Sequence, residues 1–305
     1  MTATIHHFSD STAAARRLAA EIGIECRQIA VHRFPDGESL VRAAPSAGTA
    51  IVYRSLDHPD AKLIELLLAA SALRDGGARK IILIAPYLAY MRQDIAFHPG
   101  EAVSQKVIGR LMATHFDGLI TVDPHLHRTH DLQEIVPGID ALAVSAAGTI
   151  ADMLRTDMRP DTILIGPDSE SRPWVTSVAE ALGADMLVAE KRRFGDRNVT
   201  LVIPGIERVR GCPAIIVDDL ISSGATLLQC ATLLREAGAS GIEAAATHCL
   251  GRPGDLDALA RGGIQRIRSV DTVDGPTASA PIAAALAHAL RNFPAFTRTS
   301  HTPRT

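Results

Sequence analysis

The chain has 305 residues, a net charge of −3 and a pI near 6.5, so a nucleic acid is not the expected partner. Apolar residues make up 47% of the chain but aromatic residues only 4%, which predicts an aliphatic core typical of a parallel sheet. The four cysteines are scattered and form no C-x-x-C pair, so the sequence indicates neither a zinc knuckle nor a disulfide scaffold. We find no signal peptide and no run of ~18 apolar residues, so we expect a cytoplasmic protein without a membrane partner.

Short apolar runs alternate with helical patterns along the whole chain. This alternation is typical of βαβ units, so we expect an α/β fold with mainly parallel sheets flanked by helices. The first half predicts strands at 5–8, 51–54, 80–86 and 118–123, with helices at 11–22, 60–75 and 104–115. The second half predicts strands at 162–166, 186–190, 199–203, 214–217, 242–248 and 267–270, with helices at 145–155, 172–183, 226–238 and 280–292.

The two halves share this rhythm without an evident residue-level repeat. We therefore expect two domains of one fold, residues 1–141 and 142–305, and the last helix can pack back on the first domain. In open α/β sheets, ligands bind at the carboxyl ends of the strands. The loops after the predicted strands are thus the segments in which to look for a site.

The sharpest motif is A-I-I-V-D-D-L-I-S-S-G-A-T-L at residues 214–227. An apolar strand ends at Asp218 and Asp219, and a loop of small residues leads into a helix at Thr226. Such a loop lets backbone N–H groups approach a phosphate, and the helix N-terminus adds positive potential. The alternative is an N-capping turn with solvated aspartates. The acidic pair favours a seat for a sugar phosphate, because its carboxylates can accept hydrogen bonds from sugar hydroxyls.

V-D-D-L-I-S-S-G-A-T-L resembles the ribose-phosphate-binding motif of type I phosphoribosyltransferases and phosphoribosyl pyrophosphate synthetases. The resemblance implies two phosphoribosyltransferase-like domains. The family usually has a second glycine before the threonine, and alanine at this place is a mild departure. The ribose 5-phosphate site implied by the resemblance consists of Asp218, Asp219, Ser222, Ser223, Gly224, Ala225 and Thr226.

Two segments of the first half resemble ATP-binding motifs of the synthetases. F-P-D-G-E at 34–38 is similar to a loop that reaches the adenine across a subunit interface, so we expect a homo-oligomer with a shared ATP site. Y-M-R-Q-D at 90–94, followed by P-G-E-A-V-S, is similar to a second ATP motif. Taken alone, the first segment is a β-turn signal and the second a solvated loop. The implied ATP-binding residues are Phe34, Asp36, Gly37, Glu38, Arg92 and Gln93.

Two further segments imply a metal. T-V-D-P-H at 121–125 resembles the V-D-x-H of the synthetases, which places His125 near the Mg²⁺ of ATP. A zinc site formed by Asp123 and the H-x-H of His125 and His127, with His130 nearby, is the alternative, and the flanking motifs disfavour it. P-D-S-E-S-R at 167–172 stands where the family has P-D-x-G, and Asp168 matches a magnesium-associated aspartate. Glu170 replaces the glycine, so a diphosphate there requires compensation by Mg²⁺ or Arg172.

The basic segment E-K-R-R-F-G-D-R at 190–197 resembles the start of the mobile catalytic loop of the synthetases. The resemblance implies that Lys191 and Arg193 stabilise the negative charge of the transferred diphosphate. An exposed basic turn is the plainer alternative.

The motifs together predict a ribose-phosphate diphosphokinase that uses ATP, ribose 5-phosphate and Mg²⁺. Three alternatives stay open at this point. A type I phosphoribosyltransferase would need only one such domain, and a catalytically silent relative would regulate a true synthetase. The third is a diphosphokinase for another sugar phosphate.

Overall fold

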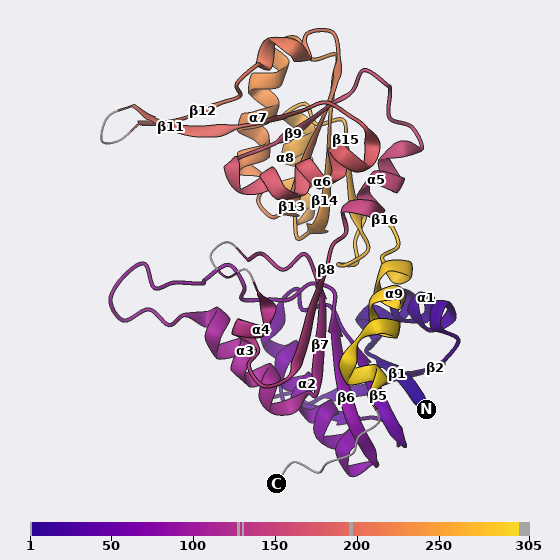
Figure 1. The fold of residues 1–305 in the computed structure, drawn as a ribbon. Coiled ribbons are helices and arrows are strands. Elements are labelled where there is room, and N and C mark those ends of the chain that lie inside the picture. The colour runs from indigo at the N-terminus through magenta and orange to yellow at the C-terminus, as the bar shows by residue number, and fades with distance from the viewer. Residues whose placement is uncertain (1, 127–128, 130, 195–197, 299–305) are drawn as a thin grey trace. The chain divides into compact units, whose positions relative to one another are not determined.

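A computed structural model describes residues 2–126, 129, 131–194 and 198–298, except the side chains of 192–194 and 198–199. The chain forms two compact units (Figure 1). Unit 1 holds residues 2–144 and 281–298, and unit 2 holds Ser145–Ala280. The division falls after Val144 rather than after the predicted residue 141, because the last strand of the first sheet continues that far. Within the described ranges, no helix has the length and apolar character needed to cross a membrane.

Unit 1 is built on a six-stranded sheet in the order β2-β1-β5-β6-β7-β8, in which all neighbours pair in parallel. The inner strands β6 and β7 are buried almost throughout, as expected for a parallel sheet with helices packed against it. Its strands are β1 (Ala3–His7), β2 (Glu25–Gln28), β5 (Gly48–Tyr53), β6 (Ala78–Ala85), β7 (Gly118–Val122) and β8 (Asp140–Val144).

The last helices of the chain belong to unit 1. α9 contacts α1 and β8, and Figure 1 shows α9 (yellow) beside α1 (indigo). Leu286 and Leu290 of α9 are fully buried, and Lys80 of β6 donates to the carbonyl of Ala295 at 2.9 Å. The helices of unit 1 are η1 (Ser9–Ser11), α1 (Thr12–Ile22), α2 (Pro59–Asp75), α3 (Ser104–His115), α4 (Leu132–Ile135), α9 (Ala283–Asn292) and α10 (Pro294–Thr297).

Unit 2 repeats the topology of unit 1. Its six-stranded sheet has the order β10-β9-β13-β14-β15-β16 with parallel neighbours throughout. The strands are β9 (Ile163–Gly166), β10 (Met186–Val188), β13 (Pro213–Ile221), β14 (Gly241–Cys249), β15 (Arg266–Val270) and β16 (Ala278–Ala280). The helices are α5 (Ala147–Arg155), η2 (Ser169–Ser171), α6 (Arg172–Leu182), η3 (Ile206–Val209), α7 (Ala225–Glu236) and α8 (Pro253–Arg261).

Each unit carries an antiparallel hairpin at the same place in its topology, after the second strand and before the third strand of its six-stranded sheet. Unit 1 has β3 (Ala30–Arg33) and β4 (Ser39–Arg42), and unit 2 has β11 (Glu190–Phe194) and β12 (Asn198–Val202). In Figure 1 the β11–β12 ribbon extends away from the sheet of its own unit. The predicted fold class, α/β with two mainly parallel sheets, is confirmed by this arrangement.

Candidate functional site

Strand β13 carries the acidic pair farther inside the sheet than the sequence predicted. The strand runs to Ile221 rather than ending at residue 217, because β14 is long enough to pair with it through Cys249. Asp218 pairs with Ala246 in this ladder, so the carboxylates stand on a rigid strand and not in a loop. The loop that follows is short, and it leads directly into α7.

The loop after β13 presents an uncapped helix N-terminus. α7 begins at Ala225, one position before the predicted Thr226, with Gly224 as its N-cap residue. Gly224 has φ of 75°, which an L-residue adopts only at a cost, and a Cβ there would lie 2.7 Å from Cδ2 of Leu259. Within the described part of the chain, no side chain caps this first turn. Its backbone N–H groups are therefore suited to bind an anion such as a phosphate.

The carboxylates of β13 are crowded. Asp219 is 3% exposed. Burial raises the pKa of Asp218 to about 8, and the neighbouring charges of Asp219 and Asp168 act in the same direction. Sugar hydroxyls that donate to these oxygens, or a cation beside them, would stabilise the charged form. The arrangement can thus bind a diol next to a phosphate.

The P-D-S-E-S segment forms a tight turn around Asp168. Its Oδ1 accepts hydrogen bonds from the N–H groups of Glu170 at 3.1 Å and Ser171 at 3.2 Å. The Ser171 hydroxyl donates back to the carbonyl of Asp168 at 2.6 Å. These two N–H groups are therefore engaged with Asp168, and a diphosphate would have to displace that carboxylate to reach them.

The other oxygen of Asp168 connects this turn to the basic hairpin. Lys191 on β11 places Nζ 3.3 Å from Oδ2 of Asp168. The structure thus brings together the predicted catalytic lysine and the predicted metal-associated aspartate. The backbone of Arg193 pairs with Val199 in the hairpin, whereas its side chain lies outside the described residues.

The residues of unit 2 fit a magnesium ion. Mg²⁺ usually takes one or two carboxylates and completes its shell with water and substrate phosphates. Asp168 offers such a carboxylate, and a cation would relieve the crowding that raises the pKa of Asp218. No group of three or more histidine, cysteine, aspartate or glutamate side chains that could hold a metal ion lies among the described residues. His127 and His130, which a zinc site would need, lie outside those residues.

In unit 1, three of the predicted residues gather at the carboxyl edge of the sheet. Arg92 and Gln93 follow β6, and His125 follows β7. Arg92 is exposed, and the Oε1 atom of Gln93 accepts from the hydroxyl of Ser104 at 2.6 Å, which leaves the amide nitrogen of Gln93 to act as a donor. His125 is half-buried.

The loops at this edge hold non-glycine residues in a left-handed backbone. His58 after β5 has φ of 50°, Tyr90 after β6 has φ of 66°, and Asp123 after β7 has φ of 33°. The Tyr90 hydroxyl donates to Asp60, which raises the pKa of Tyr90. Such strained positions gather at functional sites more often than elsewhere, so this edge is a candidate binding surface.

The remaining predicted residues form the turn of the β3–β4 hairpin. Phe34 donates its N–H to the carbonyl of Glu38 at 2.8 Å, and Gly37 has φ of 95°. Asp36 accepts from the N–H of Glu38 at 3.1 Å. All residues of the turn are exposed, and 41% of Phe34 is accessible. The turn is therefore free to contact a ligand or a partner subunit.

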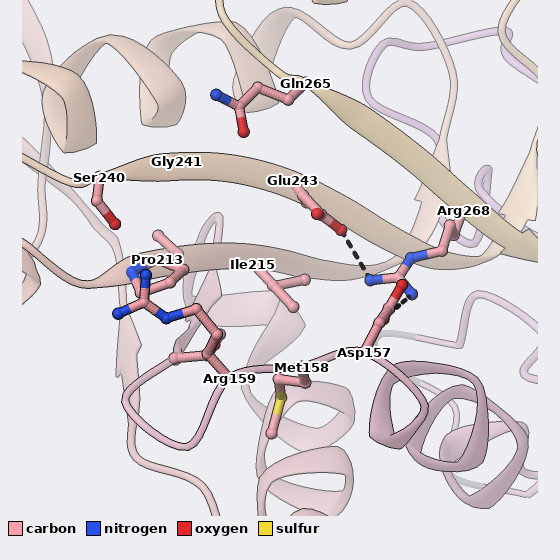
Figure 2. A pocket seen from close by; sticks show the side chains of 12 residues that line it. Asp157, Met158, Arg159, Pro213, Ile215, Ser240, Gly241, Glu243, Gln265 and Arg268 are labelled. Carbon is pink, nitrogen blue, oxygen red and sulfur yellow. Dashed lines mark hydrogen bonds and ion pairs between the residues drawn. The ribbon is translucent and has the colours of Figure 1, made fainter.

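A pocket of about 240 Å³ lies at the opposite edge of the sheet of unit 2 (Figure 2). It opens beside the first residues of β13 and β14, and none of the predicted site residues lines it. Arg268 on its wall is paired with Asp157 at 2.8 Å and with Glu243 at 2.7 Å. The charges therefore neutralise one another within the protein, and the pocket is separate from the candidate site.

Glu65 of α2 was not among the residues predicted from the sequence, yet it is 1% exposed and contacts Arg33 and Ser39, which flank the Phe34–Glu38 turn. The available signal was an acidic residue within the apolar run L-I-E-L-L-L. A buried glutamate in such a run requires a cationic partner, so its presence predicts an internal ion pair.

Comparisons with known proteins agree with this geometry. Residues 3–115 match the family model for the N-terminal domain of ribose phosphate pyrophosphokinase, and residues 138–260 match that for the phosphoribosyl transferase domain. A ribose-phosphate pyrophosphokinase of Methanopyrus kandleri is 35% identical over 288 residues, covering 93% of this chain and 97% of the relative. One of Thermococcus kodakarensis is 33% identical and covers 83% and 89%.

A solved structure shows the same arrangement of elements. The crystal structure of phosphoribosylpyrophosphate synthetase from Mycobacterium smegmatis superposes with a TM-score of 0.82 at 25% identity, covering 95% of this chain and 98% of that one. The family models, the relatives and the repeated α/β topology lead to one conclusion. The chain belongs to the ribose-phosphate pyrophosphokinase family and is an enzyme of that family.

Proposed function

We propose that this enzyme transfers the terminal diphosphate of ATP to the anomeric hydroxyl of ribose 5-phosphate, giving phosphoribosyl pyrophosphate and AMP. The observation that carries the proposal is the ion pair between Lys191 and Asp168, whose charged atoms lie 3.3 Å apart. Asp168 in turn lies close enough to β13 for its charge to raise the pKa of Asp218. A cation on a hairpin is thereby held beside the carboxylates that are suited to a sugar.

The sugar phosphate would bind at the end of β13. The first turn of α7 supplies N–H donors for the 5-phosphate, and the hydroxyls of Ser222, Ser223 and Thr226 can add donors. Asp218 and Asp219 would accept hydrogen bonds from the ribose hydroxyls. Because these carboxylates stand on a rigid strand, the anomeric hydroxyl would be held in a fixed direction, which lowers the entropic part of the barrier.

ATP would bind through the residues of unit 1. Arg92 can pair with phosphate oxygens, and the amide nitrogen of Gln93 is available as a donor because Ser104 binds its oxygen. Phe34 can stack on the adenine, while Asp36 and Glu38 can accept from its amino group. His125 would approach the metal bound to ATP through water.

The hairpin cations would act on the diphosphate as it is transferred. The transition state spreads negative charge over phosphoryl oxygens, and Lys191 and Arg193 are placed on one strand to stabilise it. Mg²⁺, when bound, supplies charge neutralisation, and Asp168 is the carboxylate of unit 2 that would hold it. We expect positioning and charge stabilisation to supply most of the rate.

A homo-oligomer with a shared ATP site is part of the proposal. The β3–β4 hairpin exposes Val31, Phe34 and Leu40, and the adjacent α2 exposes Ile64 and Leu68. Exposed apolar side chains grouped in this way are typical of a subunit interface. The exposed Phe34–Glu38 turn would then serve the nucleotide of a neighbouring subunit.

The test incubates the protein with ATP, Mg²⁺ and ribose 5-phosphate and measures the AMP formed by chromatography. A Lys191→Ala, Arg193→Ala double variant is run in parallel. We expect AMP that depends on the sugar and disappears in the double variant. Binding of both substrates without AMP formation would contradict the proposal and favour a regulatory relative, with the Glu170-containing turn as the first place to look.

A further inference from the structure

The β3–β4 hairpin needs an external support. Its strands pair only with each other in the described structure, and every residue of β3 is exposed. An isolated two-stranded hairpin is marginally stable in water. The Phe34–Glu38 turn could therefore not keep one conformation unless another element held the strands.

Val41 of β4 packs against the core, and Glu65 of α2 supports the turn itself. Arg33 and Ser39 face each other in the hairpin register, one on each side of the turn. Oε1 of Glu65 accepts from Nη2 of Arg33 at 3.0 Å and from the hydroxyl of Ser39 at 3.2 Å. A single carboxylate oxygen thus holds both ends of the turn against α2.

The carboxylate of Glu65 is itself held by a buried arginine, Arg54. Oε2 of Glu65 forms an ion pair with Nη2 of Arg54 at 2.6 Å, and both side chains are at least nine-tenths buried. Arg54 also pairs with Asp10 at 3.0 Å and stacks over Phe8, with its guanidinium carbon 3.8 Å from the ring centroid. Burial alone would raise the pKa of Glu65, but Arg54 and Arg33 lower it below its ordinary value. Glu65 is therefore charged, and its hydrogen bonds are of the strong, charge-assisted kind.

The repeated topology shows what is unusual about this network. β5 in unit 1 and β13 in unit 2 occupy the same place in their sheets, and the apolar run of each is followed by charged residues. In unit 2 these are Asp218 and Asp219, whereas in unit 1 the charged residue is Arg54. The place in unit 2 where we propose that the sugar binds is occupied in unit 1 by Arg54, which pairs with the carboxylates of Asp10 and Glu65.

We propose that Glu65, held by Arg54, is a positioning residue that orders the Phe34–Glu38 turn for the nucleotide. The inference rests on the proposed function, in which this turn contacts ATP. Glu65 does not touch the substrate; it acts through Arg33 and Ser39. The end of β5 in unit 1 is accordingly an internal support for the ATP-binding turn and not a second sugar-phosphate site.

The decisive variants are Arg33→Gln and Ser39→Ala, because they loosen the turn and leave the buried pair of Glu65 and Arg54 in place. The side chain of Arg33 is 62% exposed, so its replacement does not endanger folding. Arg33→Lys keeps the cation and tests for rescue. Arg27→Gln is the matched control, since it removes another exposed arginine from a carboxylate pair in the same unit.

Two readouts are measured on the full-length protein in its assembled form, checked by elution volume. The first is the Kd for ATP with Mg²⁺ and no sugar, by calorimetry, together with the KM values of both substrates. The second is backbone amide exchange over residues 30–42. We expect Arg33→Gln to weaken ATP binding about five- to tenfold, because the competent turn becomes a minority conformation. The KM for ribose 5-phosphate should stay unchanged, and exchange over 30–42 should accelerate.

Glu65→Gln should weaken ATP binding more than Arg33→Gln or Ser39→Ala does. Arg33→Lys should keep most of the ATP affinity that Arg33→Gln loses. The inference is overturned if Arg33→Gln and Ser39→Ala alter neither ATP affinity nor exchange, or if Arg27→Gln has the same effect as Arg33→Gln. The Kd for ATP and the amide exchange are independent of turnover, whereas the KM values are not. A wild-type protein that binds ATP but forms no AMP would therefore refute the proposed function alone.

Discussion

Gly224 provides a direct test of the ribose-phosphate loop. The residue is buried at the N-cap of α7 with φ of 75°, and an added Cβ would lie 2.7, 2.9 and 2.9 Å from Cδ2, Cδ1 and Cγ of Leu259. Leu259 is fully buried on α8, so it has no open space into which to turn. The change Gly224→Ala should therefore shift the loop or the helix.

The expected magnitude has two parts. A left-handed backbone at alanine costs about 1–2 kcal/mol. The contact with Leu259 adds about 1–3 kcal/mol of overpacking. Unfolding in urea should thus show a loss of about 2–5 kcal/mol. Displacement of the loop should raise the KM for ribose 5-phosphate at least about tenfold, which corresponds to about 1.4 kcal/mol of binding. The KM for ATP should not change.

Two controls separate these parts. Gly183 ends α6 with φ of 65° and has nothing within 4 Å of an added Cβ, so Gly183→Ala should cost only the backbone part. Leu259→Ala removes the obstacle, so the double variant should lose about 1–3 kcal/mol less than the sum of the single changes. The reasoning is refuted if Gly224→Ala matches Gly183→Ala in stability and leaves the KM for ribose 5-phosphate unchanged.

Three further predictions concern other parts of the molecule. Lys191→Met should lower kcat about 10²–10³-fold with little change in either KM, as measured by steady-state AMP formation, because its cation acts on the transition state. Phe34→Ala should raise the KM for ATP alone, because only the adenine loses a stacking surface; an equal rise for ribose 5-phosphate would contradict this. Burial lowers the pKa of His6 to about 4, so between pH 6.5 and 4 only the unfolded chain takes up the proton. The titration of His6 should lower stability by about 2 kcal/mol from pH 7 to pH 5, whereas the raised pKa of Asp218 acts in the opposite direction. The change in stability between these two pH values, measured by urea unfolding, should therefore differ by about 2 kcal/mol between the wild type and His6→Leu.

Which elements could be predicted from the sequence depends on where they lie in the sheets. β6 and β7 are apolar on both faces because helices cover them, so a continuous apolar run marked them. β2 at the sheet edge is mostly polar, β3 in the hairpin has only four residues, all of them exposed, and both strands were missed. Their pairing depends on neighbouring backbone rather than on their own side chains, and a single sequence does not reveal such neighbours.

The candidate site was predictable as a set of loops but not as a set of contacts. The D-D-L-I-S-S-G-A-T motif keeps its residues adjacent in the chain, so its chemistry could be read directly. The contact between Lys191 and Asp168 joins positions separated by 23 residues and depends on the path of the hairpin. The support of Arg33 by Glu65 spans 32 residues and depends on the packing of α2.

The two units also show how one topology can serve either a ligand or the protein itself. At the carboxyl edge of unit 2, burial and neighbouring carboxylates raise the pKa of Asp218, so the edge is stabilised by adding donors or cations from outside. At the same edge of unit 1, Arg54 and Arg33 lower the pKa of Glu65, so the charge is already compensated within the protein. Because both edges share strand order and loop positions, fold alone does not distinguish them. The balance of charge does, and it identifies the end of β13 in unit 2, rather than the end of β5 in unit 1, as the place that requires a ligand.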